Sequence, residues 1–140
     1  MKVLSPPSIM LIDDTEIDLF LNRKLIIASG ITNDIESYNS AKDALEYLKN
    51  NQSNEEKIPD IILLDIQMPE INGFEFLECY NNLPENTCNK ISVIMLSSTV
   101  DPVDKKRAIA HKHILDIMEK PLDTDLLKQI LQCKQLIQAA

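Results

Sequence analysis

Four short polar segments of this sequence contain residue types that could carry out chemistry together. They stand at the ends of apolar runs and are Asp13-Asp14, Asp65, Ser97-Ser98 and Lys120. Carboxylates that gather in one place repel one another, and a hard divalent cation such as Mg²⁺ relieves the repulsion by binding their oxygens. A nucleophilic carboxylate beside Mg²⁺, a lysine and a hydroxyl is what phosphoryl transfer to an aspartate requires.

The elements that must position these residues are predicted from the hydrophobic pattern. Five apolar runs of strand length alternate with five segments in which apolar residues recur at helical spacing. The predicted strands are 8–12, 34–38, 61–65, 91–96 and 114–119, and the predicted helices begin near residues 15, 40, 73, 101 and 124. The second and fifth strands include polar residues, as expected at sheet edges. The pattern therefore predicts an α/β fold of (βα)5 type, doubly wound and flavodoxin-like, with a five-stranded parallel sheet of order 2-1-3-4-5.

Several local features are predicted from residue type. Thr15 is expected to cap the first helix, and Gly30 to end it in the left-handed conformation. Gly73 is expected at a turn, and His111 and His113 at the surface. The apolar face of the first helix is predicted to consist of Ile17, Phe20, Leu21, Leu25 and Ala28.

The predicted strand order brings the acidic segments together. In a parallel sheet all carboxyl ends lie at one edge, and ligands bind where neighbouring strands have connections running in opposite directions. The first and third strands are such neighbours, so Asp13, Asp14 and Asp65 should share one crevice. Lys120, at the end of the fifth strand, supplies a positive charge at the same edge.

Composition limits the classes of partner. The chain has 140 residues, enough for one domain with one core, and a formal net charge of −8, which argues against direct binding of nucleic acid. No segment has the length and hydropathy of a membrane-spanning helix, so no membrane insertion is expected. Three cysteines without a metal or redox motif favour reduced thiols and a cytoplasmic location.

With these residues in place, the sequence resembles the receiver domains of bacterial two-component response regulators over nearly its whole length. The resemblance rests on Asp13-Asp14, Asp65 with Met68-Pro69 and Gly73, Ser97-Ser98, and Lys120-Pro121, in this order. It implies a single receiver domain over residues 1–140 with no output domain, similar to stand-alone chemotaxis regulators. It also implies a phosphoryl donor, either a sensor histidine kinase or a histidine phosphotransfer protein, and signalling through contacts with a downstream protein that the sequence does not identify.

By position, the resemblance implies that Asp65 is the phosphoacceptor. It implies that Mg²⁺ is held by the side chains of Asp13, Asp14 and Asp65 and by the backbone carbonyl of Gln67, with Asp13 acting directly or through water. Lys120 would pair with a phosphoryl oxygen, and the Lys120-Pro121 peptide bond would be cis.

The residues after the fourth strand complete the implied site. Ser97 corresponds to a switch hydroxyl that moves to bond the phosphoryl group, and the backbone amide of Ser98 would bind a phosphoryl oxygen. Gln67 and Thr99 flank the expected path of an attacking water molecule, so we expect them to tune the rate at which the phosphoryl group is lost.

Two positions depart from the family pattern. Ile117 stands three residues before Lys120, where family members often have an aromatic residue that turns inward on activation. His113-Ile114 replaces the usual pair of small residues before the last strand. Neither departure touches the phosphorylation chemistry, but both bear on how the signal would reach the surface.

Two other functions fit parts of the pattern. A phosphohydrolase similar to the haloacid dehalogenases would also use a strand-end aspartate, Mg²⁺ and a lysine, but it needs a second aspartate two residues after the nucleophile, where Asp13 is followed by Thr15. A scaffold that is never phosphorylated would not need all of the acidic, hydroxyl and lysine residues. Asp13-Asp14 could also serve simply as a helix cap.

Overall fold

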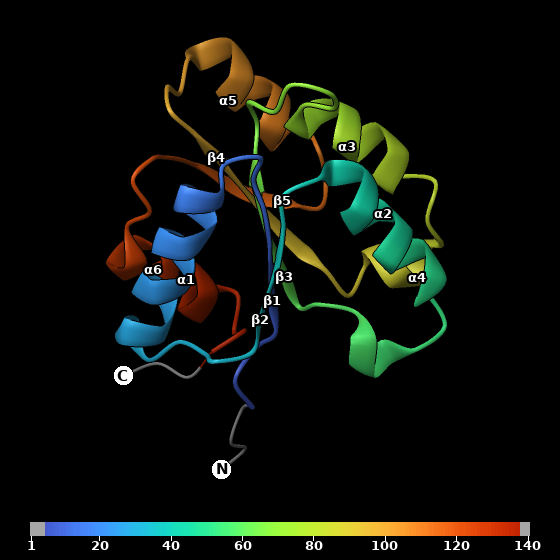
Figure 1. Ribbon diagram of the computed structural model, residues 1–140, viewed down its shortest axis with the longest axis horizontal. Helices are drawn as coiled ribbons and strands as arrows, with labels where there is room; N and C mark the ends of the chain where they lie inside the picture. The colour runs from blue at the N-terminus through green and yellow to red at the C-terminus, as the bar shows by residue number, and fades with distance from the viewer. Residues whose placement is uncertain (1–4, 138–140) are drawn as a thin grey trace.

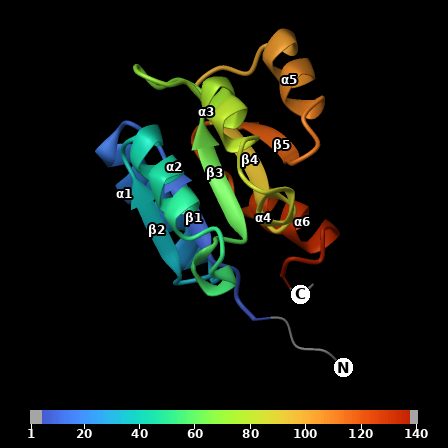
Figure 2. The same cartoon turned by 90° about the vertical axis from the view of Figure 1, so that its right-hand side faces the viewer.

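The computed structural model describes residues 5–137, so residues 1–4 and 138–140 of the predicted single domain lie outside the described part. Five parallel strands are hydrogen-bonded in the order β2-β1-β3-β4-β5, which confirms the predicted fold class and strand order. The strands stand side by side in Figure 2, with their carboxyl ends at the top. Their bounds are β1 Ile9–Ile12, β2 Ile35–Tyr38, β3 Ile61–Asp65, β4 Ser92–Ser97 and β5 Ile114–Glu119.

Helices cover both faces of the sheet. One face carries α1 and α6, and the other carries α2, α3, α4 and α5 (Figure 1). The helices are α1 Glu16–Ser29, α2 Ala41–Asn50, α3 Gly73–Tyr80, α4 Glu85–Cys88, α5 Pro102–Ile109 and α6 Thr124–Cys133, with a short 3-10 helix, η1, at Glu55–Lys57. This is the doubly wound arrangement that alternating strands and helices predict.

The central strands are apolar throughout because both of their faces are buried. Along β3, Ile61 and Leu63 pack in the layer of α1 and α6, whereas Ile62 and Leu64 pack in the layer of α2 to α5. All four are at most 1 % exposed. A continuous apolar run is therefore required here, where a sheet with one wet face would show alternation.

The two edge strands are mixed in polarity, as expected. In β2, Ile35 is buried while Glu36 and Ser37 are exposed. In β5 the pairing with β4 shifts by one residue, because Val93 pairs with Ile114 but Ile94 pairs with Asp116. Such a bulge changes which side chains face each layer along the rest of the strand.

The predicted apolar face of α1 is wrong. Four of its members, Ile17, Phe20, Leu21 and Leu25, are 38 % to 67 % exposed, and Ala28 is exposed as well. The side that packs on the sheet instead presents Leu19, Asn22 and Ile26. Because α1 carries apolar residues on more than one side, periodicity alone could not select the buried one.

Other differences lie at the ends of elements. The helix predicted to begin near residue 73 ends at Tyr80 and is followed by the separate one-turn helix α4, which the sequence did not indicate. The connection between α2 and β3 contains η1. The two histidines expected at the surface are half-buried: the ring of His113 packs edge-on against Tyr80, with centroids 6.0 Å apart, and His111 Nε2 lies 3.0 Å from Asn81 Oδ1.

The buried side of α1 can be tested by comparing two neighbouring substitutions. Leu19→Ala should lower the free energy of unfolding by about 2–4 kcal/mol, because it removes a buried side chain and leaves a cavity. Phe20→Ala should change it by less than about 1 kcal/mol, because Phe20 is 59 % exposed. Urea denaturation of the two variants measures both values, and a larger loss for Phe20→Ala would contradict this packing.

Candidate functional site

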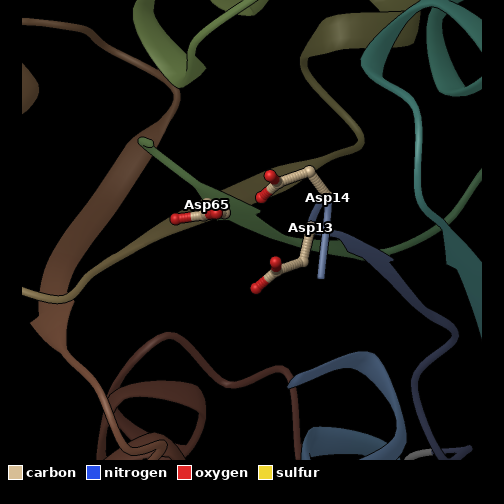
Figure 3. Close-up of side chains that lie close together, drawn as sticks. All are labelled: Asp13, Asp14 and Asp65. Carbon is tan, nitrogen blue, oxygen red and sulfur yellow. The ribbon is translucent and has the colours of Figure 1, made fainter. Parts of the chain in front are cut away.

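Three carboxylates meet at the carboxyl edge of the sheet. Asp13 and Asp14 directly follow β1, and Asp65 is the last residue of the neighbouring β3. One oxygen from each of the three lies within 4.8 Å of the others, and Figure 3 shows the three side chains extending toward the same side. Asp13 and Asp65 are each 2 % exposed, whereas Asp14 is open to solvent. The shared crevice predicted from the strand order is therefore present.

Backbone hydrogen bonds fix the positions of the site residues. The Asp13 N–H donates to a carbonyl of β2 at 3.1 Å, and the Ile66 N–H donates to a carbonyl of β4 at 2.9 Å. The Lys120 N–H donates to the last carbonyl of β4 at 2.8 Å. The ladder of the sheet thus continues into the residues that carry the site, and the Lys120-Pro121 bond is cis, as the resemblance implied.

The two buried carboxylates are also held by local turns. Asp13 Oδ1 accepts a hydrogen bond from the Thr15 N–H at 2.9 Å, and Asp65 Oδ1 accepts one from the Gln67 N–H at 3.1 Å. Thr15 occupies the N-cap position of α1, as predicted, but its side chain makes no capping hydrogen bond within the described structure. The carboxylate of Asp13 satisfies the backbone there instead.

The two glycines are needed for different reasons. Gly30 has a φ of 80°, which confirms the predicted left-handed end of α1. Gly73 is required by close packing and not by a turn conformation. A Cβ atom at residue 73 would lie 2.9 Å from Ile66 Cα and 3.0 Å from the carbonyl oxygen of Asp65. The start of α3 therefore rests directly on the backbone of the central carboxylate, which only a residue without a side chain permits.

Lys120 reaches into the cluster from the end of β5. Its ammonium lies 2.9 Å from Asp13 Oδ2, 3.0 Å from Asp18 Oδ2 and 3.4 Å from Asp65 Oδ1. Its side chain is only 20 % exposed. One cation therefore lies among three carboxylates at ion-pair distance, two of which are nearly buried.

The electrostatic cost of this arrangement appears in the pKa values. Burial, and next the nearby charge of Asp13, raise the pKa of Asp65 from 3.8 to about 6, although Lys120 partly offsets the shift. Burial acts to lower the pKa of Lys120, but its contacts with Asp13, Asp18 and Asp65 outweigh that effect, and the pKa is raised. The lysine therefore stays charged, while the central carboxylate is ionised at a cost.

Asp18 is the site residue that the sequence interpretation missed. As an acidic residue in the first turn of α1, Asp18 suits the helix dipole whether or not it belongs to a site. Its position one turn before Asn22 places it on the side of α1 that faces the sheet. That signal is present in the sequence, but the wrong choice of the buried face of α1 concealed it.

The residues at the end of β4 and directly after it are hydrogen-bonded to one another and to the loop after β3. The Ser97 hydroxyl donates to the Thr99 carbonyl at 2.5 Å and accepts from the Thr99 N–H at 3.3 Å. The Ser98 hydroxyl and N–H both donate to Gln67 Oε1, at 2.5 Å and 3.3 Å. The side chain of Gln67 thus connects the loop after β3 to the loop after β4.

The donor set suits a hard divalent cation. All of the donors are carboxylate oxygens, and burial together with the charge of Asp13 raises the pKa of Asp65, so a bound cation would favour its ionised form. On its exposed side Asp14 lines a hollow of about 330 Å³ together with Ser40 and Lys42, which leaves room for coordinated water. Few protein ligands and several waters are typical of Mg²⁺. The three residues therefore fit the acidic Mg²⁺ site typical of receivers.

The profile of one known family, the response regulator receiver domain, matches residues 9–132. This chain belongs to that family. FilR2, described as a probable methanogenesis regulatory protein of Methanothrix harundinacea, is 27 % identical over 127 residues, which cover 91 % of this chain and 80 % of FilR2. Several other curated relatives are longer proteins, of which the chain spans about half or less.

Solved receiver structures match in both fold and sequence. A response regulator receiver protein from Dyadobacter fermentans is 42 % identical, with a TM-score of 0.81 over 90 % of this chain and 95 % of the other. A two-component response regulator from Cytophaga hutchinsonii is 33 % identical, with a TM-score of 0.83 over 90 % and 94 %. The resemblance seen in the sequence is thereby confirmed.

Family membership identifies the general activity. Receivers are phosphoacceptor signalling proteins of two-component systems, so the chain is not interpreted as a haloacid dehalogenase-like hydrolase. The acidic crevice and its lysine are consistent with phosphorylation of an aspartate. No helix of the described residues has the length and apolar character needed to cross a membrane.

The stability of the metal-free protein should depend on pH through Asp65. An acid whose pKa is higher when folded destabilises the fold as the pH rises, here from 3.8 through about 6. Asp65→Asn removes this cost. Relative to the natural chain, the variant should gain about 2 kcal/mol more at about pH 7.5 than at about pH 4.5. Urea denaturation at both pH values, with a chelator present, measures the difference.

Glu78→Gln is the matched control, because Glu78 is an exposed acid on α3. Its effect should be below about 0.5 kcal/mol at both pH values. A gain for Asp65→Asn that does not grow with pH would show that the carboxylate of Asp65 is not destabilised in the fold.

Proposed function

We propose that the protein is a stand-alone response regulator in which Asp65 accepts a phosphoryl group in a Mg²⁺-dependent reaction. The donor is a phosphohistidine on a sensor histidine kinase or a histidine phosphotransfer protein. The observation that carries the proposal is the placement of Asp65 between two further carboxylates and the Lys120 ammonium at one edge of the sheet. The phosphorylated protein signals through contacts with a downstream protein and does not bind nucleic acid directly. We place this activity in the cytoplasm.

The transfer needs one nucleophilic oxygen and a way to offset charge. A carboxylate oxygen of Asp65 forms the new bond to phosphorus while the phosphorus–nitrogen bond of the donor breaks, and the departing imidazole takes up a proton. Lys120 lies close enough to turn from the carboxylates to a phosphoryl oxygen. When bound by Asp13, Asp14, Asp65 and the Gln67 carbonyl, Mg²⁺ offsets the negative charge of the transferred group.

The loops after β3 and β4 complete the proposal. The Ser97 hydroxyl, now bonded to Thr99, would turn to the phosphoryl group as the switch hydroxyl. The Ser98 N–H would bind a phosphoryl oxygen, and for this it must exchange its present acceptor, Gln67 Oε1. In this proposal Gln67 and Thr99 govern how water reaches the acyl phosphate, and the bonds of Gln67 to Ser98 and of Thr99 to Ser97 support it.

Acetyl phosphate tests the function directly. Incubation with acetyl phosphate and Mg²⁺ should add the mass of one phosphoryl group to the intact protein, because a small acyl phosphate can replace the protein donor. Asp65→Asn should abolish the added mass, and a chelator should do the same to the natural chain. Intact-protein mass spectrometry gives the readout.

Asp60→Asn serves as the control, because Asp60 directly precedes β3, at the end opposite to Asp65, and its side chain accepts hydrogen bonds from the N–H and hydroxyl of Ser8. It should be labelled like the natural chain. Equal labelling of Asp65→Asn, or no labelling of the natural chain, would overturn the proposal.

Gln67 should slow the loss of the phosphoryl group. Its side chain bridges to Ser98 across the site, and its removal opens a path for water, so Gln67→Ala should lose the label about threefold faster or more. The decay of phosphorylated mass after removal of acetyl phosphate gives the rate. Glu70→Ala, an exposed change in the same loop, should leave the rate unaltered, and an unchanged rate for Gln67→Ala would rule out the role.

A further inference from the structure

Lys120 makes its closest contacts away from the proposed phosphoacceptor. Its ammonium is 2.9 Å from Asp13 and 3.0 Å from Asp18, but 3.4 Å from Asp65. Hydrogen bonds of normal length join it to the first two. The cation that a phosphoryl group on Asp65 would need is thus engaged elsewhere in the unphosphorylated protein.

Asp18 lies on a different structural element from the other partners of Lys120. Asp13 and Asp65 come from the ends of sheet strands and belong to the acidic triad, whereas Asp18 lies on α1 and outside that triad. Its side chain is 32 % exposed, against 4 % for Asp13 and 3 % for Asp65. It links α1 to the end of β5 through the lysine.

This difference decides which carboxylate competes with a phosphoryl oxygen for Lys120 once the triad has bound a cation. A cation bound by the triad shares the charge of Asp13 and Asp65 and so weakens their attraction for the lysine. Asp18 is outside the triad and keeps its full charge for Lys120. It then becomes the strongest competitor of a phosphoryl oxygen for the same ammonium.

We propose that Asp18 is a positioning residue that holds Lys120 against α1 and competes with the phosphoryl group on Asp65 for the ammonium. The inference rests on the proposed function and adds a residue that sets both how readily the phosphoryl group is gained and how long it is kept.

The test compares rates of gain and loss of the phosphoryl group. Asp18→Asn keeps the shape of the side chain and removes its charge. With acetyl phosphate and Mg²⁺ it should be phosphorylated about threefold faster than the natural chain, and after removal of the donor it should lose the group about threefold more slowly. Intact-protein mass spectrometry over time measures both rates, and Asp18→Ser serves as a second variant should Asp18→Asn fail to fold.

Two further variants distinguish the contact of Asp18 with Lys120 from the loss of any negative charge on α1 and from a structural defect. Glu16→Gln removes one negative charge from the same turn of α1, where Glu16 bonds to Asn39 and not to Lys120. It should behave like the natural chain. Asp18→Glu restores the charge and should return both rates toward the natural values, whereas a merely structural defect would not move gain and loss in opposite directions.

The outcomes distinguish the inference from the proposed function. No labelling of the natural chain overturns the proposed function. Labelling of the natural chain with unchanged rates in Asp18→Asn overturns the role of Asp18 alone. Equal effects of Asp18→Asn and Glu16→Gln also overturn it, because they would reduce the effect to the loss of any charge on α1.

Discussion

The burial of two neighbouring carboxylates, those of Asp13 and Asp65, is the constraint on which the site in this structure depends. Both sit at the rim of the sheet at 2 % exposure, where an unpaired charge is costly. Lys120 offsets only part of the cost, because the pKa of Asp65 stays well above its usual value. A fold selected for stability alone would place an apolar or neutral residue there. The chain instead maintains a site with an excess of negative charge, ready for a cation.

The fold was predictable because strands buried on both faces, separated by helices, allow few arrangements of the sheet. Runs such as Ile61 to Leu64 cannot face water on either side, and strands of this kind, separated by helices, have few possible arrangements. The site followed from the same logic, since Asp13, Asp14 and Asp65 stand where such strands end. A sequence that is locally consistent in this way specifies both the sheet and the edge at which its chemistry lies.

What the sequence could not give were features that depend on how helices rotate and how loops close. The first helix has apolar residues on several sides, and its buried side was resolved only by packing of Leu19 and Ile26. The place of Asp18 depended on that rotation. The contact of Gln67 with Ser98 joins two loops 31 residues apart in sequence, and no local pattern encodes it.

Ile117 stands where the resemblance implied an aromatic residue, a departure that bears on how a signal would pass from the site to the surface. Ile117 is buried in the layer of α2 to α5 and pairs with Met95 of β4. An isoleucine has no ring that could exchange a buried for an exposed position. Between the ends of β4 and β5, the direct link at the site is the backbone bond from the Lys120 N–H to the Ser97 carbonyl.

The backbone bonds that carry the sheet ladder past the strand ends have a broader consequence. Asp13, Ile66 and Lys120 are each tied by a main-chain N–H to the adjacent strand, so no single loop can fray and take the acidic pocket apart. The pocket is lost when the rim of the sheet is lost. The geometry of the acidic pocket therefore depends on the integrity of the carboxyl edge of the sheet, although the buried charges of the pocket themselves cost stability.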